Sequence, residues 1–167
     1  MPHLGSFLVC EKIILDQQSK PTLITLFQGL IALVPEGQEV PKDTITGTPW
    51  SVFCEWFFDD SELDKRFEQV IEVVMPDGTP TPIRGRLPLK EVAKDRQGTR
   101  AYISLFGMPI SQTGFLSVNV WLELDSKRVT DTFSYLVKIA HAKEPPVPND
   151  GSTLAPIFPA LTQTKPS

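Results

Sequence analysis

The stretch that decides the fold is FLSVNVWLELDSKRVTDTFSYLVKI, residues 115–139. Its first half places apolar residues at every even position of 116–124, and its second half places them at the odd positions of 133–139. Apolar residues at every second position are typical of a β-strand that buries one face. A short polar segment joins the two halves, so the sequence predicts an antiparallel β-hairpin.

The apolar faces also fix the register of this hairpin. If residues 126–127 form a two-residue turn, the numbers of paired residues sum to 253. Val120 then lies opposite Phe133 and Leu124 lies opposite Val129, with all four side chains on one face. The turn lacks the Asn-Gly pair that is typical of tight hairpins, so its geometry stays open.

The same register points Trp121 away from the apolar face of the hairpin. Its neighbours on the opposite face are polar, and an outward tryptophan ringed by polar residues is typical of a protein or sugar contact. An equally good alternative places Trp121 beneath Ile157 or Phe158 of the C-terminal segment. The candidate interaction residues on this face are Trp121, Asn119, Glu123 and Thr132.

The rest of the chain contains further apolar, β-branched and aromatic runs that end at Pro, Gly or polar clusters. We expect residues 6–16 and 22–34 to form a second hairpin, with Gly29 marking a bulge or a close backbone approach. Residues 83–87 lie between prolines, which fits an edge strand, and residues 89–96 have the apolar spacing of one short helix. The other predicted strands are residues 50–58, 67–75 and 100–106.

Composition favours the same fold class. The chain has 167 residues, enough for one domain, and its sixteen Pro and ten Gly interrupt it too often for long helices. We therefore predict an all-β protein, an antiparallel β-sandwich of about seven to nine strands with one short helix, over residues 1–140. Residues 141–167 hold six of the sixteen prolines, so we expect an extended or partly disordered tail.

Two further segments are candidate contact surfaces. The tail carries an apolar run at residues 154–161, which either packs back on the sandwich or acts as a docking motif through Ile157 and Phe158. Residues 84–100 contain six Lys or Arg and two acidic residues, a local net charge of +4. This charge favours self-association or an acidic partner, and the alternative is an ordinary solvated edge. The basic candidates are Arg84, Arg86 and Lys90.

Charge and hydropathy exclude several classes of partner. The chain has 16 Lys+Arg and 20 Asp+Glu, a net charge of −4 and a pI near 5.2, so it lacks the positive charge on which nucleic-acid binding depends. The uncharged stretch of residues 21–35 is shorter than the ~20 apolar residues of a membrane helix. Cys10 and Cys54 have no metal or disulfide spacing, so we expect buried free thiols. We therefore expect a soluble, cytoplasmic protein with neither nucleic-acid nor membrane partners.

Four segments together resemble an uncharacterised family of small bacterial proteins. They are LVCEKIILDQ, PTLITLFQGL, MPDG and the closing GFLSVNVWLELDSKRVTDTFSYLVKI, and the most distinctive feature is the Cys10-Glu11-Lys12 segment with the strand after it. The resemblance covers about residues 6–140 and leaves out the tail. It implies a β-sandwich fold and no catalytic residue.

No motif of the chain indicates a reaction. The two histidines, His3 and His141, lie near the ends of the predicted domain, where they are poorly placed to serve a Ser or Cys nucleophile. The densest group of carboxylates, within residues 59–64, lacks the glycine that calcium loops use to turn, so we expect a solvated connector with room for one helical turn. We expect no catalytic, metal or cofactor site.

Three functions follow from these observations, in order. The first is a non-catalytic protein-binding or assembly module, with a protein partner or self-association. The alternative is a sandwich that binds a small ligand or carbohydrate through exposed tryptophans. The third is an enzyme of unrecognised type.

Overall fold

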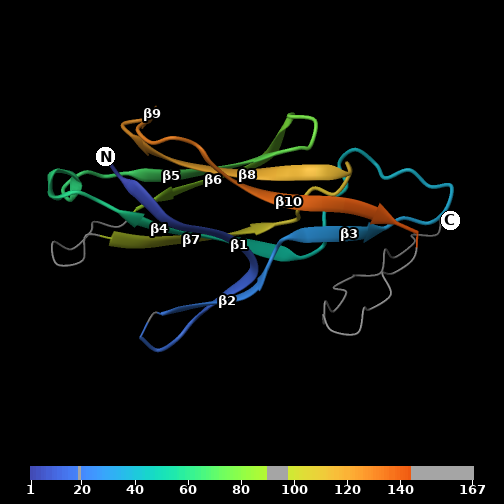
Figure 1. Ribbon diagram of the computed structural model, residues 1–167, viewed down its shortest axis with the longest axis horizontal. Coiled ribbons are helices and arrows are strands. Elements are labelled where there is room, and N and C mark those ends of the chain that lie inside the picture. Colours follow the sequence, from blue (N-terminus) through green and yellow to red (C-terminus); the bar gives the residue numbers. More distant parts are fainter. Residues whose placement is uncertain (19, 90–97, 144–167) are drawn as a thin grey trace, which may run out of the picture.

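The computed structural model describes residues 1–18, 20–89 and 98–143, which fold into two packed β-sheets (Figure 1). The smaller sheet has the order β2-β1-β4-β7 and the larger has the order β3-β10-β8-β5-β6, with β9 paired to β8. In the described residues the helical structure is a single 3-10 turn at Asp60–Glu62, within the acidic connector. The strands are β1 (His3–Leu15), β2 (Pro21–Leu26), β3 (Gly29–Leu33), β4 (Pro49–Phe57), β5 (Glu68–Val74), β6 (Pro80–Pro88), β7 (Gly98–Phe106), β8 (Gly114–Leu124), β9 (Lys127–Arg128) and β10 (Phe133–Ala142).

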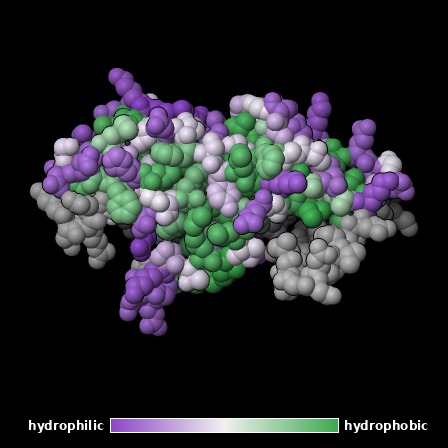
Figure 2. Space-filling view, in the orientation of Figure 1, coloured by the Kyte–Doolittle hydropathy of each residue, from purple (hydrophilic) through white to green (hydrophobic). Residues whose placement is uncertain are grey.

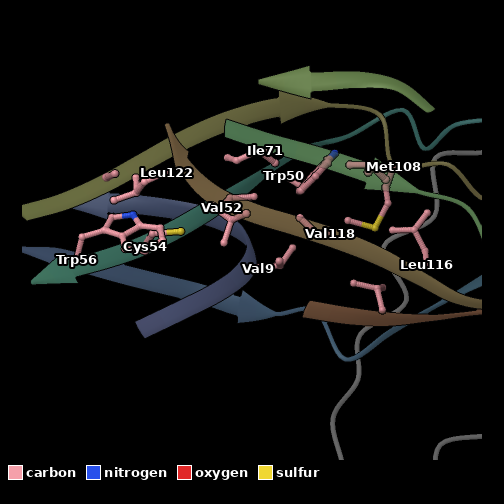
Figure 3. Close-up of a cluster of buried hydrophobic side chains, with 14 of the residues drawn as sticks. Val9, Trp50, Val52, Cys54, Trp56, Ile71, Met108, Leu116, Val118 and Leu122 are labelled. Atoms are coloured by element: carbon pink, nitrogen blue, oxygen red, sulfur yellow. The ribbon is translucent and has the colours of Figure 1, made fainter. Parts of the chain in front are cut away.

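The core lies between the two sheets and is built from alternate residues of their central strands. From the smaller sheet, β4 contributes Trp50, Val52, Cys54 and Trp56, all at most 1% exposed. From the larger sheet, the even positions of β8 supply the opposite wall, as the alternation in residues 115–125 predicts (Figure 3). Burial of the aromatic and aliphatic side chains in this layer is the main stabilising contribution to the sandwich.

The predicted all-β sandwich is confirmed, with ten strands in the described residues where seven to nine were expected. One pair departs from a purely antiparallel sandwich, because β3 runs parallel to β10. The strand over residues 83–87 is confirmed as an edge and extends further than expected, as β6. The helix over residues 89–96 lies, apart from Leu89, outside the described residues, and so do residues 144–167 of the tail.

The single strand predicted over residues 22–34 is wrong. The chain divides there into β2 in the smaller sheet and β3 in the larger sheet. Phe27 is still bound to β1, since its N–H donates to the Val9 carbonyl at 2.9 Å. Gly29 then begins β3 against Lys138, whose carbonyl oxygen would lie 3.1 Å from a Cβ at this position. The expected close backbone approach at Gly29 is therefore correct, and it marks the passage between sheets.

The predicted register of the closing hairpin is confirmed away from its turn. Val120 lies opposite Phe133, and the pairing continues in this register to Ile139, which lies opposite Gly114. At the turn the prediction is wrong, because residues 125–126 form it and Leu124 lies opposite Lys127. Asp125 and Ser126 have φ angles of 51° and 62°, as in the primed two-residue turns that match the twist of a hairpin.

The two registers are reconciled by extra chain in residues 129–132. This segment bulges between β9 and β10 and includes Thr130, which is buried. The Leu122 N–H donates to Thr130 Oγ1 at 2.9 Å, so at this point a side-chain oxygen takes the place of a backbone carbonyl as the acceptor. The bulge keeps the apolar residues of β10 on the core side while the turn itself stays tight.

Candidate functional site

Trp121 lies on the outer face of the larger sheet, as its register predicts, but it is only 2% exposed. It is not part of the core cluster between the sheets. Its neighbour in the sheet, Val70 of β5, is also fully buried, and Arg86 of β6 lies opposite Val70. The outward orientation is therefore confirmed, whereas the accessible tryptophan that it suggested is wrong.

Two arginines cover the indole ring of Trp121. The Cζ atom of Arg128 lies 4.2 Å from the ring centroid, and that of Arg84 lies 5.8 Å away. Thr132, which the uniform register paired with Trp121, instead accepts a hydrogen bond from Arg128 Nη1 at 2.8 Å. Cation–π attraction and the aliphatic stems of the arginines together replace water above the ring.

Glu123 closes the same cluster from the side. Its Oε1 accepts a hydrogen bond from Trp121 Nε1 at 2.9 Å, and its Oε2 forms an ion pair with Arg86 Nη1 at 2.9 Å. The Trp121 bond and Arg86 hold the pKa of this carboxyl below its usual value, against the opposing effect of burial. Arg86 also binds Glu68, which raises the pKa of its guanidinium.

Asn119 extends this polar layer toward β10. Its Oδ1 accepts hydrogen bonds from Ser117 Oγ at 2.8 Å and from Ser134 Oγ at 2.7 Å. The polar groups around the indole thus bind one another, and the indole ring itself is covered. We refer to the following residues together as the Trp121 face: Arg84, Arg86, Asn119, Trp121, Glu123, Arg128 and Thr132.

The structure brings several sequence candidates together and leaves others outside the described residues. Arg84 and Arg86 of the basic segment join the Trp121 face, while Arg100 lies on the other sheet and pairs with Glu55 at 2.9 Å. The described arginines of that segment are therefore held by contacts within the molecule. The candidates outside the described residues are Lys90, Ile157 and Phe158.

The other two tryptophans are also buried. Trp56 is 0% exposed and its Nε1 donates to Gln69 Oε1 at 2.7 Å, while Trp50 is 1% exposed. Both belong to the core, where they lie on the same side of β4 as Cys54. A ligand-binding function through exposed tryptophans consequently loses its physical basis, because all three indoles are covered.

A second surface, which the sequence analysis missed, is the far end of the β1–β2 hairpin. β1 pairs with β4 only as far as Cys10, and from Lys12 to Leu15 it pairs with β2 alone. β2 is the edge of the smaller sheet. Figure 1 shows this end of the hairpin projecting from the body of the sandwich.

The projecting end is aliphatic on both of its faces, and none of its large side chains is buried. Ile14, Leu15 and Leu26 are 43%, 41% and 45% exposed. Figure 2 shows hydrophobic residues gathered where β2 leaves the body. We call the following six residues the hairpin surface: Ile13, Ile14, Leu15, Leu23, Ile24 and Leu26.

The other sheet edges are protected in ways that β2 is not. β6 contains three prolines and two arginines, β3 has only five residues, and β7 lies against β6, where Ile103 fills the space left by Gly85. Prolines, charges and short length are the usual means of keeping an edge strand from pairing with another chain. β2 has one proline, at its first position, and no charged residue. The sequence signal for this surface was the apolar residues at both parities in 13–15 and 23–26.

The remaining candidate chemistry is structural. Cys10 and Cys54 are both free and 0% exposed, and burial raises the pKa of each thiol, so neither is poised to react. His141 Nε2 lies 2.7 Å from the Ile110 carbonyl oxygen, and the part of the chain that the structure describes has no cluster of three or more metal-ligating side chains. No helix in the same residues is long and apolar enough to cross a membrane.

No protein-family model and no curated protein matches the chain. The resemblance to a family of small bacterial proteins therefore stays a prediction. Other large apolar residues are more exposed, among them Phe106, Phe115 and Leu136, but the residues of the hairpin surface lie together beside an open edge strand and a projecting hairpin, so we take this surface as the candidate site.

Proposed function

We propose that the chain is a non-catalytic protein-binding module that contacts its partner through the hairpin surface. The observation that carries this proposal is the set of five aliphatic side chains on a projecting two-stranded hairpin, with Leu26 beside them on the edge strand where the hairpin leaves the body, and none of the six is buried. A two-stranded hairpin is at best marginally stable in water unless another surface covers it. Contiguous exposed aliphatic residues beside an open edge strand are typical of a protein contact.

The backbone of β2 supports the same function. As the edge of the smaller sheet it offers unpaired N–H and C=O groups along one side, to which an extended segment of a partner can add as a further strand. Side chains of the partner would then pack beside Ile24 and Leu26. No charged residue within β2 opposes this approach.

The Trp121 face is a weaker candidate for contact with a partner. Its arginines and carboxylates already bind one another, so a partner would have to displace these ion pairs before reaching the indole. Two buried free thiols are compatible with a reducing compartment, which supports our inference of a cytoplasmic location.

Site-specific photo-crosslinking tests the proposal. A photoreactive amino acid replaces Thr22, an exposed residue of β2 paired with Ile14, in the full chain expressed in its own organism. We expect a discrete protein adduct that is absent when the same group replaces Thr79, which is exposed in the β5–β6 turn.

A matched pair of lysine substitutions serves as the control. Leu26→Lys removes an apolar group from the hairpin surface and should abolish the Thr22 adduct. Leu136→Lys makes the same change at a residue that is 55% exposed on the outer face of the larger sheet and should leave the adduct intact. Equal adduct yields from both variants would refute the proposed function. The absence of an adduct in the parent chain and in every variant would refute it as well.

A further inference from the structure

The chain contains an apolar segment whose composition matches the uncovered hairpin surface. Residues 154–161, LAPIFPAL, have no charged or polar side chain. The six residues of the hairpin surface are likewise aliphatic, and the charged residue beside them, Lys12 opposite Ile24, is exposed. Contact between two such surfaces removes apolar area from water on both sides without burying a charge.

The connecting chain is long enough to bring the two together. The Lys138 N–H of β10 donates to the Gln28 carbonyl, and Gln28 is two residues along the chain from Leu26 of β2. With five residues from Lys138 to Lys143, Leu26 lies no more than about 30 Å from the end of the described chain. The eleven residues from Lys143 to Leu154 span up to about 36 Å when extended.

The prolines of the segment suit it to a side-chain contact on an edge strand. Pro156 and Pro159 favour an extended backbone, so the segment loses little conformational entropy on docking. They also remove N–H donors, so a docked segment cannot itself template another strand. A tethered segment acts at an effective concentration of the order of millimolar, which favours it over a second copy in solution.

We propose that the segment Leu154–Leu161 docks on the hairpin surface of its own chain and competes with the protein partner for it. This inference rests on the proposed function for the identity of the surface. The competition makes the tail an intramolecular inhibitor: a partner must supply enough contact to displace it. Removal of the apolar character of the segment should therefore increase access to β2.

Thiol reactivity in the full chain measures this access. Thr22→Cys supplies an exposed thiol on β2, while Cys10 and Cys54 are 0% exposed and do not compete for the reagent. The rate of modification by 5,5′-dithiobis(2-nitrobenzoic acid) is compared with and without Ile157→Asp and Phe158→Asp. We expect the rate to rise about fivefold or more when the segment is disrupted, at any protein concentration.

Two controls separate docking from general effects. Thr162→Asp with Thr164→Asp adds the same charge to the tail outside the apolar segment and should leave the rate unchanged. Thr113→Cys, at an exposed residue before β8, should react at the same rate in every tail variant. An unchanged rate at Thr22→Cys, or an equal rise at both reporters, would overturn the inference.

A second copy is the competing occupant, and dilution reveals it. Protection of Thr22→Cys that disappears on dilution of the protein would assign the hairpin surface to another molecule and overturn the intramolecular contact. The crosslinking experiment reports the proposed function separately. Protection without any adduct, even from the tail-disrupted chain, would retain the inference and refute the partner, whereas an adduct without protection would do the reverse.

Discussion

The Trp121 face and the hairpin surface both lie outside the core, yet the apolar residue of the first is buried and those of the second are at least partly exposed. Trp121 is a large aromatic residue on an outer face and is 2% exposed, because Arg84 and Arg128 lie over its ring. Leu26 is a smaller aliphatic residue on an edge strand and is 45% exposed. Apolar character alone therefore does not determine which of the two is available for contact.

The difference is made by long amphipathic neighbours. Arginine can lay its aliphatic stem and its flat guanidinium on an apolar surface while its charge stays in contact with water or a carboxylate. On β2 the polar neighbours of the hairpin surface are the short side chains Thr22 and Thr25. These threonines cannot reach over Leu26, and the long side chain opposite Ile24, that of Lys12 on β1, is itself exposed, so Ile14, Leu15 and Leu26 stay more than 40% exposed.

The largest expected effect comes from removing the covered aromatic ring. Trp121→Ala should lower the free energy of unfolding by about 3–5 kcal/mol, because the cavity lies between Val70 and the two arginines. Leu26→Ala should cost less than about 1 kcal/mol, since nearly half of that side chain is in water in the folded state. Urea titration of both variants checks this contrast, and comparable losses would show that the hairpin surface is structurally buried.

The next largest effect is expected from removing an arginine that covers Trp121. Arg128→Gln removes the cation 4.2 Å above the indole and should cost about 0.5–2 kcal/mol. The variant should also make tryptophan fluorescence more accessible to acrylamide, because Trp50 and Trp56 stay in the core. Lys127→Gln is the matched control, as it removes a charge on the same short strand without a described contact to the ring. Quenching that rises equally in both variants would contradict the role of Arg128.

Much of this arrangement follows from the sequence, and the reasons why the rest does not are physical. Alternation along residues 115–139 gives the hairpin, the core side of β8 and the outward direction of Trp121, because strand periodicity depends only on the local chain. Burial of Trp121 depends on Arg84, which is two strands away across β5, and on Arg128 beyond a turn. Such cross-strand contacts have no local pattern.

The hairpin surface was missed for a related reason. Residues 22–34 are apolar at most positions and interrupted by one glycine, so the pattern predicts a single strand. The break into β2 and β3 places the halves in different sheets and leaves β2 with one neighbour. Sequence reasoning could have noted that Ile13, Ile14 and Leu15 are apolar at successive positions, which requires cover on both faces.

A smaller effect concerns acid stability. The folded state holds the pKa of Glu123 below its usual value of 4.5, so its ionised form stabilises the fold. That contribution is present above about pH 4.5 and is lost as the pH falls through the lower, folded-state value. Glu123→Gln should therefore flatten the loss of stability below pH 4.5, measured by urea titration across that range. Glu39→Gln, at an exposed loop position, should retain the parental slope.

The smallest effect on the free energy of unfolding is expected from substitutions in the hairpin surface. Ile14→Lys with Leu26→Lys should change the free energy of unfolding by no more than about 0.5 kcal/mol per site, because both side chains are more than 40% exposed. The same pair should lower the fluorescence of 1-anilinonaphthalene-8-sulfonate with the folded chain, since this dye reports uncovered apolar surface. Leu136→Lys, on the outer face of the larger sheet, should lower that signal less, because Leu136 has no projecting apolar hairpin around it. A change in stability without a change in dye binding would mean that Ile14 and Leu26 hold the sandwich together and offer no free surface.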